Sequence, residues 1–205
     1  MSLSSFLTNS QIDLVADASV IINLNATARA ADIIRAFRNP FVVTDNACAE
    51  LEAGIRSGHR DYEQLTGLID AGFMQRVQLG AASAPVYESL VSGSTAKTLD
   101  DGEAATIAYA HKSGGVALIE QRKAKAICAV LFPRLQIAST VELLLHDAVA
   151  TVLGAKGQVD AIVNALMTAR MRVPPEHLAR IKGLIGPERA ALCTSLPRAT
   201  RGPAT

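Results

Sequence analysis

The sequence contains no tryptophan, and aromatic residues make up only 4% of its 205 residues. Its hydrophobic content is nevertheless 49%, and alanine, valine, leucine and isoleucine supply most of it. This composition is typical of helices that pack on a parallel sheet, because the strands of such a sheet are buried on both faces. The hydrophobic content suffices for a core, and the length predicts one domain, or one domain with an appendage.

Features of membrane-spanning and secreted proteins are also missing. No apolar run approaches the roughly 18 residues of a membrane span, and no basic region followed by an apolar segment marks a signal peptide. We therefore expect a cytoplasmic protein that does not bind membranes. The cysteines, Cys48, Cys128 and Cys193, are scattered and odd in number. They fit a reducing compartment and form no zinc or disulfide pattern.

The net charge is only +1, but acidic and basic residues are unevenly distributed. Residues 1–147 contain 12 Lys and Arg against 16 Asp and Glu, whereas residues 148–205 contain 8 against 3. An acidic body with a basic C-terminal part suits a carboxylate site beside a surface that binds a polyanion. Ordinary scatter of charges explains the same asymmetry about as well.

The stretch from Ile12 to Ile22 combines a strand and a helix. Its first half is a short apolar run around Val15, and its second half, from Ala18 on, has the apolar spacing of a helix. Asp17 lies at the junction, and open α/β sheets bind ligands at the carboxyl ends of their strands. Asp17 is therefore a candidate for catalysis, although a helix N-cap is the more frequent role of an aspartate in this position.

Strands and helices alternate along the rest of the chain. Further strands are predicted over residues 41–43, 73–79, 116–119 and 135–138. Helices are predicted over residues 28–37, 44–55, 60–71, 85–91, 99–111, 121–131 and from 139 on, and then over 159–171 and 174–185. This alternation favours an α/β fold with a central parallel sheet and helices on both faces.

The same pattern divides the chain into segments. Residues 1–11 are expected to form an N-terminal segment, whose first residues could be a remnant of cloning. The main domain is predicted over residues 12–150, and the C-terminal helices over 151–187 are expected to pack on it. Residues 188–205 are rich in proline, threonine, arginine and glycine towards their end, and this tail is predicted to be disordered.

Four acidic residues stand out by their position relative to the predicted strands. Asp17 and Glu120 end strands, whereas Glu50 and Glu103 lie early in helices that follow loops. If the strands of Asp17 and Glu120 are neighbours, these carboxylates converge at one edge of the sheet. A cluster of such oxygen ligands binds Mg²⁺ or Mn²⁺, and bound ions of this kind assist in-line displacement at a phosphodiester.

Each of these acids also has an ordinary structural interpretation. Asp100 and Glu103 have the spacing of a capping box. Glu50 and Glu52 could form a solvated helix face, and Glu120 could be an acid in a first helical turn, where the helix dipole favours it. The four histidines share no motif and are expected to be surface or packing residues: His59, His111, His146 and His177.

Four segments, taken in order, resemble the motifs of PIN-domain nucleases. They are Val15-Ala-Asp17-Ala-Ser-Val-Ile-Ile22, Val42-Val-Thr44 followed by Glu50-Leu51, Leu99-Asp-Asp-Gly-Glu103-Ala-Ala-Thr-Ile107-Ala, and Val116-Ala-Leu-Ile-Glu120-Gln-Arg-Lys-Ala124. The C-terminal part, from Gly154-Ala-Lys-Gly through Met171-Arg-Val-Pro-Pro-Glu-His-Leu178, is similar to a branch of VapC-like toxin ribonucleases of type II toxin–antitoxin systems. The resemblance covers residues 12–185 and rests on the ordered set, since no single motif is specific.

The resemblance implies a PIN-like three-layer α/β/α sandwich with a central parallel sheet and a C-terminal helical extension. It also implies a Mg²⁺- or Mn²⁺-dependent endoribonuclease that cleaves RNA phosphodiester bonds with a metal-activated water. Asp17, Glu50, Glu103 and Glu120 are then the predicted catalytic residues and metal ligands. The expected partners are RNA and a small antitoxin protein, with a homodimer as a further option.

The fourth motif departs from the family pattern. The chain has Glu120-Gln121 where the pattern has paired aspartates. Glu120 can substitute with a longer side chain, and Gln121 can coordinate through its carbonyl or through a water but carries no charge. Ser19 could hydrogen-bond a metal-bound water, or it could simply cap the helix.

This departure keeps a second interpretation open, in which the chain is a catalytically silent PIN-like module that binds RNA or a protein. A third interpretation, a nucleotide-binding or phosphatase-like α/β protein, is disfavoured. No glycine-rich fingerprint follows the first strand, and Asp17 is not followed by a second aspartate two residues later.

Overall fold

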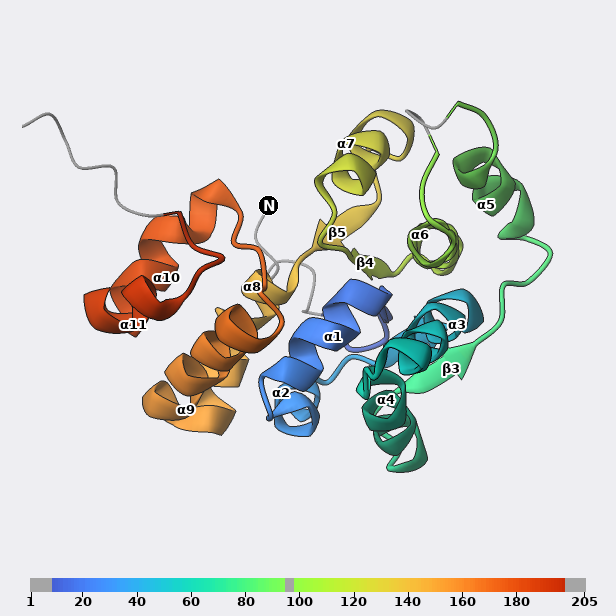
Figure 1. Cartoon of the computed structure of the whole chain (residues 1–205). Coiled ribbons are helices and arrows are strands. Elements are labelled where there is room, and N and C mark those ends of the chain that lie inside the picture. The colour runs from blue at the N-terminus through green and yellow to red at the C-terminus, as the bar shows by residue number, and fades with distance from the viewer. Residues whose placement is uncertain (1–8, 95–97, 198–205) are drawn as a thin grey trace, which may run out of the picture.

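The structure, a computed structural model, describes residues 9–94 and 98–197. Its centre is a parallel sheet of five strands in the order β3-β2-β1-β4-β5 (Figure 1). The strands are β1 Leu14–Ala16, β2 Phe41–Thr44, β3 Gln75–Val77, β4 Val116–Leu118 and β5 Gln136–Ala138. This arrangement confirms the predicted α/β/α sandwich with a central parallel sheet.

The strand order places β1 at the point where the direction of the chain through the sheet reverses. The chain runs outward from β1 through β2 to β3, returns to β4 on the other side of β1, and ends the sheet at β5. Val15 pairs with Val42 on one side and with Ala117 on the other. In open α/β sheets ligands bind outside the carboxyl ends of the strands at such a switch point, here beyond the ends of β1 and β4.

Two hydrophobic cores cover the two faces of the sheet, because successive residues of a strand point to opposite faces. Leu14 and Ala16 belong to one core and Val15 to the other, and all three are fully buried. The second core is closed by residues of α5, α6 and α7, among them Leu90 and Ile107. Burial on both faces explains why β1 and β4 read as unbroken apolar runs in the sequence.

The helices of the main domain agree with the predicted segments to within a few residues. Their bounds are α1 Ala18–Ala26, α2 Ala30–Ala36, α3 Asp45–Ala53, η2 Gly54–Ser57, α4 Asp61–Asp70, α5 Ala84–Val91, α6 Asp101–Ser113 and α7 Arg122–Leu131. Among the described residues, no helix is both long and apolar enough to cross a membrane.

The C-terminal helices begin earlier than the sequence predicts. They are α8 Thr140–Leu144, α9 Asp147–Thr168, η3 Pro175–His177, α10 Leu178–Ile185 and α11 Pro187–Leu192. The first turns of α9 were missed because Gly154 and Gly157 disfavour a helix, and the chain kinks at Gly154, where φ is 70°. The predicted boundary after residue 150 therefore falls within α9.

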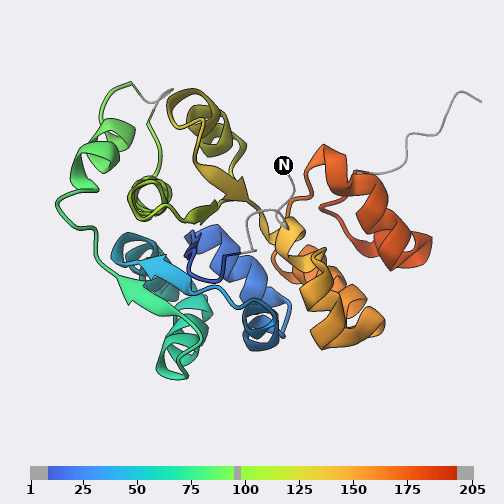
Figure 2. The same cartoon turned by 180° about the vertical axis from the view of Figure 1, so that it is seen from behind.

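The C-terminal helices pack on the main domain rather than on each other alone. α9 contacts α1, α2 and α8, and α10 contacts α9 (Figures 1 and 2). Ile162 and Ile181 belong to the same core as Leu14. The prediction that the tail from residue 188 is disordered is wrong for residues 188–192, which lie in α11. Leu196, further along the same tail, is buried in this core. The rest of that tail, 198–205, and residues 1–8 of the N-terminal segment lie outside the described residues.

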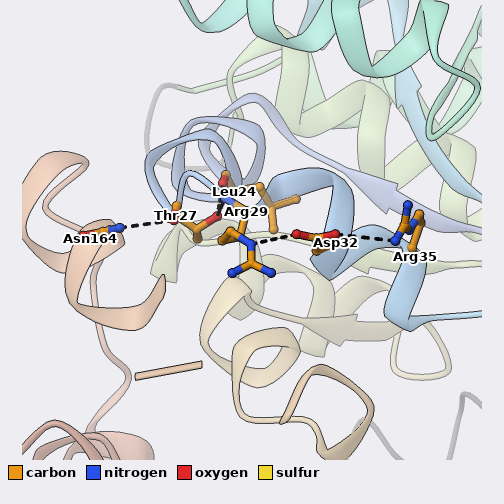
Figure 3. Close-up of polar contacts among 6 residues, drawn as sticks. All are labelled: Leu24, Thr27, Arg29, Asp32, Arg35 and Asn164. Atoms are coloured by element: carbon orange, nitrogen blue, oxygen red, sulfur yellow. Dashed lines mark hydrogen bonds and ion pairs between the residues drawn. The ribbon is translucent and has the colours of Figure 1, made fainter. Parts of the chain in front are cut away.

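A set of polar contacts fixes α9 on the turn between α1 and α2 (Figure 3). Asn164 Nδ2 donates to the carbonyl of Thr27 (3.3 Å), and Thr27 Oγ1 donates to the carbonyl of Leu24 (2.5 Å). The backbone N–H of Arg29 donates to Thr27 Oγ1 (3.0 Å), and Asp32 pairs with the Arg29 side chain (2.7 Å). These contacts hold the second half of α9, and therefore the segment that follows it, in a defined position.

Candidate active site

The four predicted acids meet at one pocket beyond the carboxyl ends of β1 and β4. Asp17 follows β1 directly, Glu120 lies two residues after β4, Glu50 is on α3 and Glu103 is in the first turn of α6. The pocket has a volume of about 360 Å³. Its lining residues are Asp17, Ser19, Ile22, Asn23, Glu50, Asp100, Glu103, Glu120, Gln121, Ala169, Arg170, Met171 and Arg172. Whether the acids are metal ligands and catalytic groups stays a prediction.

Asp17 caps α1 and faces the pocket at the same time, so its two interpretations are compatible. Its Oδ2 accepts from the Ser19 hydroxyl (2.6 Å) and from the Ser19 backbone N–H (3.4 Å). Its Oδ1 is buried without a hydrogen-bond partner, although the residue is only 3% exposed. Ser19 therefore orients the Asp17 carboxylate and leaves one oxygen uncommitted.

Glu103 provides a second uncommitted oxygen. It is 5% exposed, and its Oε2 has no hydrogen-bond partner. A buried polar atom without a partner costs free energy, and such atoms in a pocket mark a place where a ligand can supply the missing interaction.

Gly102 allows the carboxylates to approach one another. A Cβ atom at this position would lie 2.6 Å from Glu50 Oε2 and 3.5 Å from Asp17 Oδ1. Only glycine leaves this space to the carboxylates of Glu50 and Asp17, and α3 packs against α6 here. The glycine next to Glu103 is thus part of the site.

Burial and mutual repulsion perturb the ionisation of these acids. Burial raises the pKa of Asp17, and the charge of Asp100 adds to this rise. Burial also raises the pKa of Glu50, with a further contribution from Asp17. The pKa of Glu103 is raised to about 7, first by burial and then by the charges of Asp17, Asp100 and Glu50. The pocket therefore holds more negative charge than it stabilises by itself.

The residues of the fourth motif have different local roles. Glu120 Oε1 accepts from the backbone N–H of Thr140 (2.7 Å), the first residue of α8. Glu120 is thus bound to the start of α8 and not only to the pocket. Gln121 occupies the N-cap position of α7 without a side-chain capping bond.

The sequence pattern assigned Asp100 to helix capping and did not point to Ile22, Asn23 or residues 169–172, which also line the pocket. Asp100 is at the N-cap position of α6, but its side chain makes no capping bond and lines the pocket instead. The predicted reciprocal capping box with Glu103 is therefore not formed. Asn23, a lining residue on α1, donates a hydrogen bond to Thr140 Oγ1 (3.3 Å). The neighbouring acids in Leu99-Asp-Asp-Gly-Glu103 were the sequence feature that could have identified Asp100 as a residue of the site.

The donor chemistry of the pocket fits a hard divalent cation, because its uncommitted groups are carboxylate oxygens. The uncommitted oxygens of Asp17 and Glu103 are the observation that carries this fit. Within residues 9–94 and 98–197, however, no group of three or more His, Cys, Asp or Glu side chains is already arranged to hold a metal ion.

Comparison with known proteins agrees with the fold. The model of the domain family DUF3368, a PIN domain, matches residues 13–187. No curated protein and no solved structure matches the chain. The matched residues include all five strands and the carboxylate pocket. Because the match covers most of the sequence, the chain belongs to the PIN-domain family.

Proposed function

We propose that this protein is a metal-dependent endoribonuclease whose Asp17, Glu50 and Glu103 hold Mg²⁺ or Mn²⁺, with Glu120 at the same site. The observation that carries the proposal is the pair of buried, unpartnered carboxylate oxygens of Asp17 and Glu103 at the switch point of the sheet. The family supports the general part of the proposal, a nuclease that uses a divalent metal ion, because PIN domains are generally nucleases and generally use such ions.

The residues of the pocket would have separate roles at this site. A bound divalent cation activates a water and stabilises charge on the oxygens of a phosphodiester. Ser19 holds Asp17 so that Oδ1 stays available. The raised pKa of Glu103, about 7, means that the metal-free site retains a proton near neutral pH. Cation binding should then release protons, because carboxylate ligands bind in the deprotonated form.

The toxin role is a further part of the proposal. It rests on the similarity of the ordered motifs and the C-terminal part to VapC-like toxin ribonucleases. In this role the partners are RNA and a small antitoxin protein, and the protein could act as a homodimer. An adjacent reading frame that encodes a small DNA-binding protein would support the toxin role, and its absence would count against it.

A catalytically silent module that binds RNA or a protein is the second candidate. Two observations favour it: Gln121 carries no charge where the family pattern has an aspartate, and Glu120 already binds the N–H of Thr140. In this case Glu120 would stabilise the start of α8 and the pocket would bind no catalytic ion.

Melting curves in EDTA and in Mn²⁺, together with RNA cleavage, separate the two candidates. A ligand that binds only the native state raises the melting temperature, so the nuclease proposal expects such a rise for the wild type and for the exposed control Asp70→Asn. Asp17→Asn should lose both the rise and the cleavage. An identical Mn²⁺ response in wild type and Asp17→Asn would show that Asp17 is not a metal ligand.

A further inference from the structure

The carboxylate pocket has a basic rim that comes from the far end of the chain. Residues 169–172 follow α9 and line the pocket, and they include Arg170 and Arg172. These are the only cationic side chains among the described residues that line the pocket, which also contains five carboxylates. The basic C-terminal part of the sequence thus meets the acidic body at this point.

The backbone of this segment is held in place despite strain at Arg170. Arg170 has φ of 53°, in the left-handed region that normally favours glycine. The next residue, Met171, is 1% exposed, and its N–H donates to the carbonyl of Ala165 (3.1 Å). Strained conformations persist where surrounding packing enforces them, and they cluster at functional sites. An arginine therefore occupies a position that glycine would fill at lower cost.

The side chains of Arg170 and Arg172 are not used to stabilise the fold. Both residues are exposed, and neither forms a hydrogen bond or an ion pair within the described part of the chain. The carboxylates in the same pocket are thus beyond ion-pair distance of both guanidinium groups. The two arginines are free to bind an anion at the rim, beside the buried oxygens of Asp17 and Glu103.

We propose that Arg170 and Arg172 bind phosphate groups of a single RNA strand and position it over the carboxylate pocket. This inference rests on the proposed function and names the residues that hold its substrate. A guanidinium group matches a phosphate with two parallel hydrogen bonds and stays charged at all relevant pH values. The rim would supply positive charge that the carboxylates cannot, so that a polyanion can approach an acidic pocket.

The test measures how tightly the full chain binds a fluorescein-labelled 12-nucleotide oligouridine. Fluorescence anisotropy gives the binding constant in EDTA at KCl concentrations from 50 to 300 mM. The variants are Arg170→Ala with Arg172→Ala, Arg170→Gly, and Arg134→Ala as the matched control. Arg134 is exposed, makes no hydrogen bond or ion pair within the described residues, and precedes the amino end of β5, at the opposite edge of the sheet.

The double variant should bind about ten-fold more weakly for each arginine removed. Its plot of log K against log salt should be shallower by about 1.4, since each phosphate contact to a single strand contributes about 0.7. Arg134→Ala should bind like the wild type. Arg170→Gly should bind more weakly but melt no lower than the wild type, because glycine relieves the strain.

An unchanged affinity and salt slope in the double variant would overturn the inference, and so would an equal loss in Arg134→Ala. The same strand in Mn²⁺ separates this inference from the nuclease proposal. Mn²⁺-dependent cleavage by the wild type, with binding that does not depend on the arginines, overturns only the role of the rim. Binding that depends on the arginines, without any cleavage, supports the RNA-binding role of the rim and overturns the nuclease proposal.

Discussion

Glu103→Gln tests the electrostatics of the metal-free pocket most directly. Glu103 has its pKa raised from 4.5 to about 7 in the folded protein, with burial as the largest cause. Below pH 4.5 both the folded and the unfolded state carry the proton, so Glu103 does not affect stability. Between pH 4.5 and 7 the folded state binds more protons, so stability falls as pH rises. Above pH 7 the full cost of ionisation is present.

The magnitude follows from the size of the rise. Each tenfold change in the ionisation constant corresponds to about 1.4 kcal/mol, so the ionised Glu103 destabilises the fold by at most about 3 kcal/mol above pH 7. Glutamine has the same shape without the charge. The free energy of unfolding of Glu103→Gln relative to wild type should therefore increase by up to this amount between pH 5 and pH 8.

Urea unfolding in EDTA at pH 5, 6, 7 and 8 measures this difference. Any constant cost of the substitution, such as an amide group without a partner, cancels when the values at two pH are subtracted. The exposed Glu88 on α5 offers Glu88→Gln as the control, which should show no such pH dependence. A difference between Glu103→Gln and wild type that stays constant from pH 5 to pH 8 would refute the reasoning.

Three further predictions address other parts of the site and fold. Metal-free Asp17→Asn should melt at the same or a higher temperature than wild type, because it removes repulsion between carboxylates and keeps the helix cap; a clear loss of stability in EDTA would contradict this. Gly102→Ala should change the free energy of unfolding by less than about 1 kcal/mol, since the added Cβ displaces only the flexible end of Glu50, but it should reduce the Mn²⁺-dependent rise in melting temperature. A fragment of residues 1–150 should melt below the full chain, because Ile162 and Ile181 belong to the main core; a proteolytic fragment of this length with native melting behaviour would show otherwise.

The sheet and its carboxylates could be predicted from the sequence because their signals are local. Apolar runs such as 116–119 define buried strands, and an acid directly after a strand, such as Asp17, must lie at the carboxyl edge of the sheet. Which strands neighbour β1 was left open by the sequence, and the structure shows that they are β2 and β4. The convergence of Asp17 and Glu120 was therefore predicted only on the condition that β1 and β4 are neighbours, as the structure shows them to be.

The rest of the pocket depends on packing that no local pattern expresses. Arg170 follows α9, which docks on α1 and α2, and its left-handed backbone precedes the buried Met171. Asp100 has the position of a helix cap, but its side chain lines the pocket where α3 packs on α6. The start of α9 was hidden by its glycines, which have low helix propensity, and at Gly154 the backbone does leave the helical conformation.

The hydrogen bond between Glu120 and the first N–H of α8 links the pocket to helix formation. α8 leads into α9, and the arginine rim follows α9. A change in the position of the Glu120 carboxylate would therefore leave a backbone donor at the start of α8 without its partner. Glu120 thus ties the acidic pocket to the start of the helical segment whose far end returns to the same pocket as the arginine rim.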